Sequence, residues 1–298
     1  MRNAKSIKTY RSFSDYIFKG LIWLFLIIMM LAILIPVLHV IASSLSDVKA
    51  VKAGKVFIWP VDFSLESYKV VFNTPTLMRA LLNSIAYTVG YIIVAVSLTL
   101  LAGYPLSRKD LRGRSMVMAL YTFTMFFGGG MIPTYIVVSK LGLVDSYWGV
   151  ILPGAVGVWN VILVKTYIQT SIPEEIFESA SLDGCSDWKY FLHMVLPLSK
   201  SIVAVMVLLY GVIKWNDFMS GLLYINTPEK QTFQYVLRSI LIVNDGSVLS
   251  LAEELKRQET KDLLQYSLIM VSTIPIMALY PFVQKHFVKG VLMGSIKG

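Results

Sequence analysis

Six long apolar stretches alternate with polar segments along the 298 residues of the chain. A helix needs about 20 residues, at a rise of about 1.5 Å each, to cross the hydrocarbon core of a bilayer, and every stretch reaches that length. The stretches cover approximately residues 20–43, 81–107, 115–138, 147–170, 202–224 and 264–284. No internal repeat or linker rich in Pro, Gly or Ser divides them. The pattern predicts an all-α, polytopic membrane protein, with an N-terminal tail at 1–19 and one domain of six transmembrane helices at 20–298.

The composition agrees with this class. Hydrophobic residues make up 56% of the chain and charged residues 15%, whereas about a quarter of a soluble protein's residues are charged. The first apolar run, 20–42, has 23 residues and exceeds the about 7–15 residues of a signal-peptide core, so we expect an uncleaved span. The net charge of +9 could suggest nucleic-acid binding. The basic residues are instead scattered over the tails and membrane flanks, so we expect a bilayer and no nucleic acid as partner.

A basic loop between the second and third spans predicts the orientation, because short loops rich in Lys and Arg stay on the cytoplasmic side. Its basic residues are Arg108, Lys109, Arg112 and Arg114. Since the number of spans is even, both termini and the polar loop at 171–200 share the cytoplasmic side. We therefore expect a multi-pass protein of the plasma or inner membrane, with a cytoplasmic N-terminus and C-terminus.

Two longer loops, 44–80 and 225–263, then lie outside. The first has a short amphipathic pattern at Leu65, Tyr68 and Phe72. The second has a charge run at 253–262. That run fits a solvated helix with i,i+4 ion pairs, and it also fits a docking surface for an extracellular binding protein.

The polar loop between the fourth and fifth spans keeps apolar residues at helical spacing. Ile176, Phe177 and Ala180 share one face of a first short helix. Gly184 suits the left-handed residue that ends this helix. Asp187 is expected to cap a second short helix, and Pro197 to end it. The loop is therefore predicted to form two amphipathic helices that are bent at a glycine and lie at the membrane surface.

The same loop carries a motif with fixed spacing. Glu178-Ser179-Ala180 is followed after three residues by Gly184, and after nine more by Met194-Val195-Leu196-Pro197. This resembles the EAA loop of ABC-importer permeases, with Ser179 and Met194 in place of the usual Ala and Ile. The alternative is an ordinary interhelical loop, but the spacing match argues against it.

The resemblance implies a type I ABC importer fold in which residues 171–200 form the coupling helix that sits on a separate ATPase. The residues it assigns to ATPase coupling are Glu178, Ser179, Ala180, Asp183, Gly184, Leu196 and Pro197.

Other segments resemble the carbohydrate-uptake permeases of the maltose-permease group. They are Asn83-Ser84, residues 101–108, Ile132-Pro133-Thr134-Tyr135 and Trp215-Asn216-Asp217-Phe218. Gly128-Gly129-Gly130 and the ending from Tyr280 to Gly298 resemble a subset linked to larger oligosaccharides and polysaccharide fragments. These resemblances imply a permease subunit that imports a sugar, with an oligosaccharide as the expected cargo.

The implied partners are a second homologous permease subunit, an ABC ATPase dimer and an extracellular or periplasmic solute-binding protein. ATP and Mg²⁺ would bind the ATPase. No G-x-x-x-x-G-K-[ST] phosphate loop and no H-E-x-x-H motif occurs here, and the three histidines are isolated in sequence. We therefore expect a transport subunit that is not an enzyme and holds no metal or cofactor.

Polar residues inside the fifth span are candidates for the sugar path. Lys214 and Asp217 lie within the hydrocarbon core, where a charge costs about 2.5–3.5 kcal/mol on insertion scales. The two could neutralise each other at i,i+3 spacing, or they could face a water-filled path. In the second case Trp215 could stack on a pyranose, while Asn216 and Asp217 could bond its hydroxyl groups.

Two further positions are weaker candidates. Trp159-Asn160 falls 12 residues after Tyr147, near mid-bilayer. An Asn there bonds a neighbouring helix or a substrate, and helix packing is the commoner use. Tyr135 follows the break expected at Gly128–Gly130 and Pro133, and a broken helix is tolerated only beside protein or a water-filled cavity.

Three other functions remain open from the residues. A permease of the same superfamily could carry an amino acid, a peptide or a polyamine. A membrane-embedded enzyme would need a catalytic constellation among the intramembrane residues, and none is found. A passive channel would have no use for a coupling loop.

Overall fold

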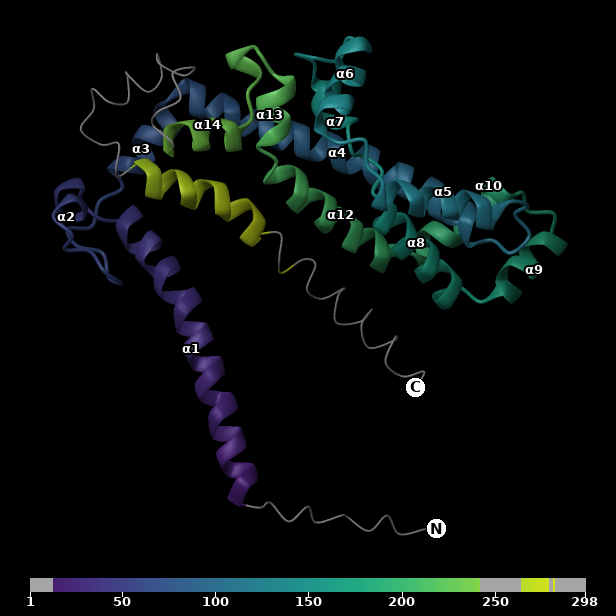
Figure 1. The fold of residues 1–298 in the computed structure, drawn as a ribbon, viewed down its shortest axis with the longest axis horizontal. Helices are drawn as coiled ribbons and strands as arrows, with labels where there is room; N and C mark the ends of the chain where they lie inside the picture. The colour runs from purple at the N-terminus through teal and green to yellow at the C-terminus, as the bar shows by residue number, and fades with distance from the viewer. Residues whose placement is uncertain (1–12, 242–263, 279–280, 282–298) are drawn as a thin grey trace. The chain divides into compact units, whose positions relative to one another are not determined.

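The structure is a computed structural model that describes residues 13–241, 264–278 and 281 of the chain (Figure 1). The described residues form helices and loops, with a single isolated β-bridge between Ser46 and Phe63. They belong to two compact units, which are taken in turn. The first comprises residues 1–70 and 255–270, and the second comprises residues 71–254 and 271–298. The predicted charge run at 253–262 and the C-terminal ending after 281 lie outside the described residues.

The first unit is built on α1 (Phe13–Ser44), a helix of 32 residues. Its large apolar side chains are exposed along most of its length, as expected for a helix that faces lipid. Only its last turn is buried, where the hydroxyl of Ser46 donates to the carbonyl of Ala42 at 2.6 Å. After α2 (Val48–Lys52), the helix α3 (Glu66–Asn73) forms at the amphipathic pattern predicted between the first and second spans.

The second unit is organised around α4 (Pro75–Ser107), a helix of 33 residues that begins with a proline at its first turn. It starts earlier than the predicted second span and packs against both α8 (Val158–Ser171) and α12 (Lys200–Trp215). Gly103 permits the close approach to α8, because a Cβ atom at that position would lie 2.7 Å from a methyl carbon of Val164. The buried side chains of Tyr91, Ala95 and Met206 belong to the resulting core.

The third predicted span is not one helix. α5 (Arg114–Phe126) and α6 (Met131–Lys140) are bent by 113° across the glycine triplet. Gly130 adopts a left-handed φ of +85°, which glycine accepts without the steric penalty that other residues meet. The prediction of a break here is confirmed, and α5 and α6 together form a candidate span over the predicted stretch 115–138.

The fourth and fifth predicted spans are also interrupted. α7 (Tyr147–Ile151) is separated from α8 by a segment that contains Pro153 and Gly154, residues that interrupt helices. α12 likewise ends before α13 (Met219–Tyr224), at Asn216 and Asp217. The prediction of continuous helices at 147–170 and 202–224 is therefore wrong.

The remaining described elements are two short helices of the second unit and one longer apolar helix. The short helix Pro228–Lys230 (η2) and α14 (Phe233–Leu241) both pack against α4. The last apolar helix is described over Leu264–Ala278, so the end of the sixth predicted span lies outside the described residues. By length and composition α1 and α4 could each cross a membrane alone, and two bent pairs could do so together: α5 with α6, and Asp187–Leu198 with Lys200–Trp215.

Candidate functional site

The coupling segment, residues 174–198, forms two short helices and a wider turn. α9 (Glu174–Leu182) ends at Gly184, whose φ is +71° and whose amide donates to the Ser181 carbonyl at 3.0 Å. α10 (Asp187–Tyr190) follows, then a π-helical turn at Phe191–Val195 and α11 (Leu196–Leu198). The predicted pair of helices, broken at a left-handed glycine, is confirmed.

Two details of that prediction are wrong. Ser186, not Asp187, is the N-cap of α10: its extended backbone lets its hydroxyl accept from the amide of Lys189, while Asp187 is already helical. Pro197 does not end the second helix. It lies in the first turn of α11, where a missing N–H is tolerated, and the helical turns continue to Leu198 before a bend of 78° leads into α12.

An aromatic cluster seats the coupling segment on the end of α4. The ring of Tyr104 lies 5.1 Å from that of Phe191 and 6.4 Å from that of Tyr190, measured between centroids. Phe177 on α9 meets Tyr190 edge to face at 5.2 Å. Tyr190 and Phe191 are 3% and 5% exposed, so the two short helices share one apolar contact with α4. Aromatic pairs of this kind contribute about 0.5–1.5 kcal/mol beyond their buried area.

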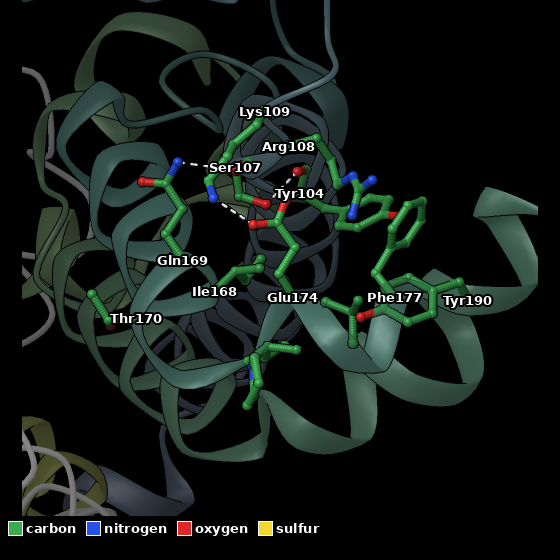
Figure 2. Close-up of a pocket in the computed structure, with 13 residues that line it drawn as sticks. Tyr104, Ser107, Arg108, Lys109, Ile168, Gln169, Thr170, Glu174, Phe177 and Tyr190 are labelled. Atoms are coloured by element: carbon green, nitrogen blue, oxygen red, sulfur yellow. Dashed lines mark hydrogen bonds and ion pairs between the residues drawn. The ribbon is translucent and has the colours of Figure 1, made fainter. Parts of the chain in front are cut away.

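A charged rim surrounds this cluster (Figure 2). The guanidinium carbon of Arg108 lies 3.1 Å from the ring centroid of Phe177, a cation–π contact between the α4 end and α9. Lys109 forms an ion pair with Glu174, but both side chains are largely solvated, so the pair contributes at most about 1 kcal/mol. A hydrogen bond from Arg108 lowers the pKa of Asp110.

A cavity of about 420 Å³ lies inside this rim, between the end of α4, the end of α8 and α9 (Figure 2). On its wall the side-chain amide of Gln169 donates to the Ser107 carbonyl at 3.0 Å, which joins α8 to α4. This bond ties the end of α8, from which the chain continues into the coupling segment, to the end of α4, on which that segment packs.

The residues assigned to ATPase coupling divide into two groups. Glu178, Ser179, Asp183 and Gly184 are exposed on one side of the segment. Ala180 is 8% exposed and faces the aromatic cluster. Leu196 is half-buried and Pro197 is exposed.

Sequence reasoning missed two features of this site. Leu182 is 90% exposed beside the glycine bend, an apolar side chain in a position that usually carries a polar one. The basic loop predicts an orientation through Arg108 but gives no sign of its contact with Phe177. The place of Arg108 directly after a long apolar run could have suggested a contact with the adjacent loop.

Lys214 and Asp217 pair with each other. Nζ of Lys214 lies 2.7 Å from Oδ2 of Asp217 and donates to the Val150 carbonyl at 2.8 Å. The same ammonium lies 4.6 Å from the ring centroid of Tyr91. Asp217 also accepts from the amide and the hydroxyl of Ser220, at 2.9 and 2.5 Å. With the Lys214 side chain only 5% exposed, this arrangement favours the structural alternative, a pair that neutralises itself.

Some of the other candidates for the sugar path are buried by packing, and the rest are exposed. Trp215 is 6% exposed and donates through Nε1 to the Ser272 carbonyl at 2.7 Å, so little of its ring is open to a sugar in this conformation. Asn160 is buried in the first turn of α8, after the break at Pro153 and Gly154. Trp159 and Asn216 are exposed, and Tyr135 stacks parallel to Tyr224 with centroids 6.3 Å apart.

A network of polar side chains at the opposite end of α4 was not predicted. Asp145, at a left-handed φ of +59°, accepts from the hydroxyl of Thr227 at 2.5 Å and from Nζ of Lys230 at 3.0 Å. The Thr227 hydroxyl, together with Lys230, holds the pKa of Asp145 well below its usual range. Asn83 donates to the Glu229 carbonyl at 2.8 Å, which ties the same loop to α4. This network holds the loops around α7 and η2 against the start of α4.

Comparison with known proteins identifies the family. No protein-family model matches the chain. The polygalacturonan/rhamnogalacturonan transport system permease protein YtcP of Bacillus subtilis (strain 168) is 42% identical over 283 residues, which cover 95% of this chain and 99% of that protein. The maltodextrin transport system permease protein MdxG of the same organism is 27% identical over 93% of this chain and 95% of its own.

A solved structure has the same fold. It is the crystal structure of a bacterial ABC transporter involved in the import of the acidic polysaccharide alginate, and one of its chains matches with a TM-score of 0.86 at 29% identity. The match covers 93% of this chain and 99% of that chain. Together with the full-length similarity to YtcP, it shows that this chain belongs to the sugar-transport permeases of ABC importers.

Proposed function

We propose that this permease imports oligosaccharides derived from an acidic polysaccharide, with its coupling segment seated on a separate ATPase. The fold and the family are those of a sugar permease of an ABC importer. The finer proposal of an acidic cargo is supported by two relatives: one is named for polygalacturonan and rhamnogalacturonan, and the other belongs to an importer of alginate. Polygalacturonan and alginate are both rich in carboxylates.

The observation that carries the coupling role is the seat of the segment on α4. Ala180, Tyr190 and Phe191 face inward, while Glu178 and Asp183 face outward and are free to contact a partner. A force applied to the exposed side of the coupling segment would thus be transmitted through the packed aromatic rings to Tyr104, and from there to α4, a helix of 33 residues. Because α4 packs against α8 and α12, its displacement moves the elements that flank the helix breaks.

The implied partners follow from this mechanism. ATP and Mg²⁺ would bind the ATPase dimer that grips two coupling segments, one from this chain and one from a second homologous permease. A solute-binding protein would deliver the oligosaccharide to the other face. Both termini and the coupling segment of this chain would then be cytoplasmic, in agreement with the basic loop at 108–114.

The cargo path is proposed to use the exposed candidates. Trp159 and the face of Tyr135 that is not stacked on Tyr224 suit a pyranose ring, and Asn216 offers an amide for its hydroxyl groups. Trp215, Asn160 and Asp217 would act behind them by fixing the ends of α12 and α8. Weak contacts suffice here, since tight binding would slow release.

The decisive experiment is to purify the complex from its native membrane, identify its subunits and reconstitute it in liposomes. We expect a co-purifying ATPase, and ATP-dependent uptake of an oligogalacturonide delivered by its binding protein. Stimulation of ATP hydrolysis by an amino acid, a peptide or a polyamine in place of the sugar would contradict the proposal. Uptake that continues without ATP would contradict it in a different way, by indicating a channel.

A further inference from the structure

A second cavity opens between α5 and α8, away from the coupling segment. It is a groove of about 560 Å³, bounded at one end by Arg114 and reaching Phe126, and Lys165 of α8 contributes to its wall. Arg114 to Phe126 spans 12 residues of α5, or about 18 Å at helical rise. The groove therefore runs along most of the length of α5.

The charge of the groove is unbalanced. Its lining contains two cations, Arg114 and Lys165, and no carboxylate. Within the described part of the chain neither cation takes part in an ion pair, although Arg114 donates to the Arg108 carbonyl at 3.1 Å. Lys165 lies six residues before the end of α8, about 9 Å along the helix, and is only partly buried, so its ammonium is open to the groove. An ionisable residue within a spanning segment is by default a candidate functional residue.

The rest of the lining suits a sugar. Phe123 and Phe126 are 57% and 73% exposed. Phe123 stacks on Phe127 with centroids 4.6 Å apart, which leaves its other face and the ring of Phe126 open to a pyranose. Thr122 places a hydroxyl beside them. α5 buries none of its own side chains, and α8 is held on its other side by the fully buried Val164 against α4. Lys165 therefore lies on α8, which is packed against α4, and faces α5, whose side chains are not buried.

From this combination we infer that the groove between α5 and α8 binds the carboxylate of an acidic oligosaccharide through Lys165 and Arg114, with Phe123 and Phe126 under the sugar rings. The inference rests on the proposed function, because it takes the acidic cargo from there and adds the residues that select it. The shared chemistry is a carboxylate or phosphate oxygen against two cations, so an anionic lipid headgroup is the competing occupant.

The test compares one cargo in two forms, an oligogalacturonide and its methyl ester, in which the carboxylates are neutral. The intact complex is reconstituted in phosphatidylcholine vesicles, and ATP-driven uptake is measured for wild type, Lys165→Gln, Lys165→Arg and Lys140→Gln. Lys140 is an exposed lysine at the end of α6 that does not line the groove.

Neutralising Lys165 is expected to lower the uptake efficiency of the acidic form about tenfold or more, which is the effect of losing one hydrogen bond to a charged group. Uptake of the ester should change little. Lys165→Arg should retain most of the acidic uptake, and Lys140→Gln all of it. Equal losses for both cargo forms would overturn the inference. So would an effect of Lys165→Gln that needs added phosphatidylglycerol, since a lipid would then be the occupant.

A second measurement covers the case in which Lys165→Gln does not assemble. Carbodiimide treatment of the wild-type complex during turnover joins a lysine amine to a carboxylate in contact with it, and peptide mapping should find the oligogalacturonide on Lys165. Adducts only at other lysines would overturn the inference. If the wild-type complex imports a neutral sugar and neither galacturonide form, the acidic cargo itself is wrong. If it imports the acid and the variants behave as wild type, only the groove is wrong.

Discussion

Gly184 is the residue on which the shape of the coupling segment depends. Its left-handed backbone is costly for residues that carry a Cβ atom, by about 1–2 kcal/mol, yet nothing lies within 4 Å of the position that this atom would occupy. A large side chain there would therefore project outward into the contact proposed for the ATPase and leave the core of the subunit intact.

We expect Gly184→Phe to insert and assemble but to lose most transport, while ATP hydrolysis persists without stimulation by cargo. The matched control is Gly113→Phe, another left-handed glycine with open space around it, at the start of α5. Uptake and hydrolysis measured on the same proteoliposomes separate coupling from assembly. Unchanged uptake in the Gly184 variant would contradict the coupling role.

The Lys214–Asp217 pair sets a second expectation at this scale. Removing one partner of a buried pair leaves an uncompensated charge, a loss of about 3–5 kcal/mol. Asp217→Ala should therefore reduce the amount of folded protein in the membrane, because Lys214 keeps only neutral partners. Asn216→Ala, one residue away and exposed, should leave that amount unchanged.

Membrane-protein yield and thermal unfolding of the purified complex would measure this effect. The double variant Lys214→Met/Asp217→Ala should recover part of the yield, since it removes both charges. An Asp217→Ala complex that remains as stable as wild type but fails to import sugar would return Asp217 to the cargo path.

At the scale of elements, the rings between α4 and the coupling segment determine how closely the two move together. Phe191 is 5% exposed and contacts Tyr104, whereas its neighbour Leu192 is 39% exposed. A cavity at Phe191 would let α10 shift without displacing α4, and Phe→Ala changes in cores cost about 3–5 kcal/mol.

Phe191→Ala is thus expected to raise the number of ATP molecules hydrolysed per sugar imported, with Leu192→Ala as the control. Single-turnover uptake together with phosphate release gives that ratio. A Phe191→Ala complex with the wild-type ratio would show that the aromatic seat is not the route of transmission.

The helix breaks are the other feature of this scale. α5 to α6, α7 to α8 and α12 to α13 are each interrupted where glycine, proline or a side chain competes for the backbone. Asp217 illustrates the last case, because its carboxylate takes the Ser220 amide, a backbone donor at the start of α13. The length of an apolar run does not show where a side chain takes a backbone hydrogen bond from the helix. The predicted spans therefore include the positions at which the helices break.

For the whole molecule, the orientation is the property that the basic loop predicts. The chain has a single cysteine, Cys185, and it lies in the bend of the coupling segment, where it is partly exposed. We expect a membrane-impermeant maleimide to label it in inside-out vesicles of the subunit expressed without its ATPase, and not in right-side-out vesicles.

The variant Cys185→Ser has no cysteine and should not be labelled, so it gives the background of the measurement. Cys185→Ser combined with Lys140→Cys moves the thiol to the exposed end of α6 and should reverse the pattern, since the two positions are predicted to lie on opposite sides. Labelling of Cys185 in right-side-out vesicles would show that the topology is the reverse of the predicted one, and it would contradict the coupling role.

The sequence by itself determined the class, the family and the coupling loop of this protein. These depend on local properties: the length of apolar runs, the spacing of Glu178, Gly184 and Pro197, and a glycine whose backbone needs no distant contact. Each can be read from neighbours along the chain, which is why the prediction of two helices bent at Gly184 is confirmed.

Only the tertiary structure decided which side chains meet. Trp215 changed from a sugar platform to a packed ring because its partner, the Ser272 carbonyl, lies 57 residues away. Arg108 meets Phe177, and Asp145 meets Lys230, for the same reason. Contacts between segments far apart in sequence depend on how α4, α8 and α12 pack, and no periodicity within one segment contains that information.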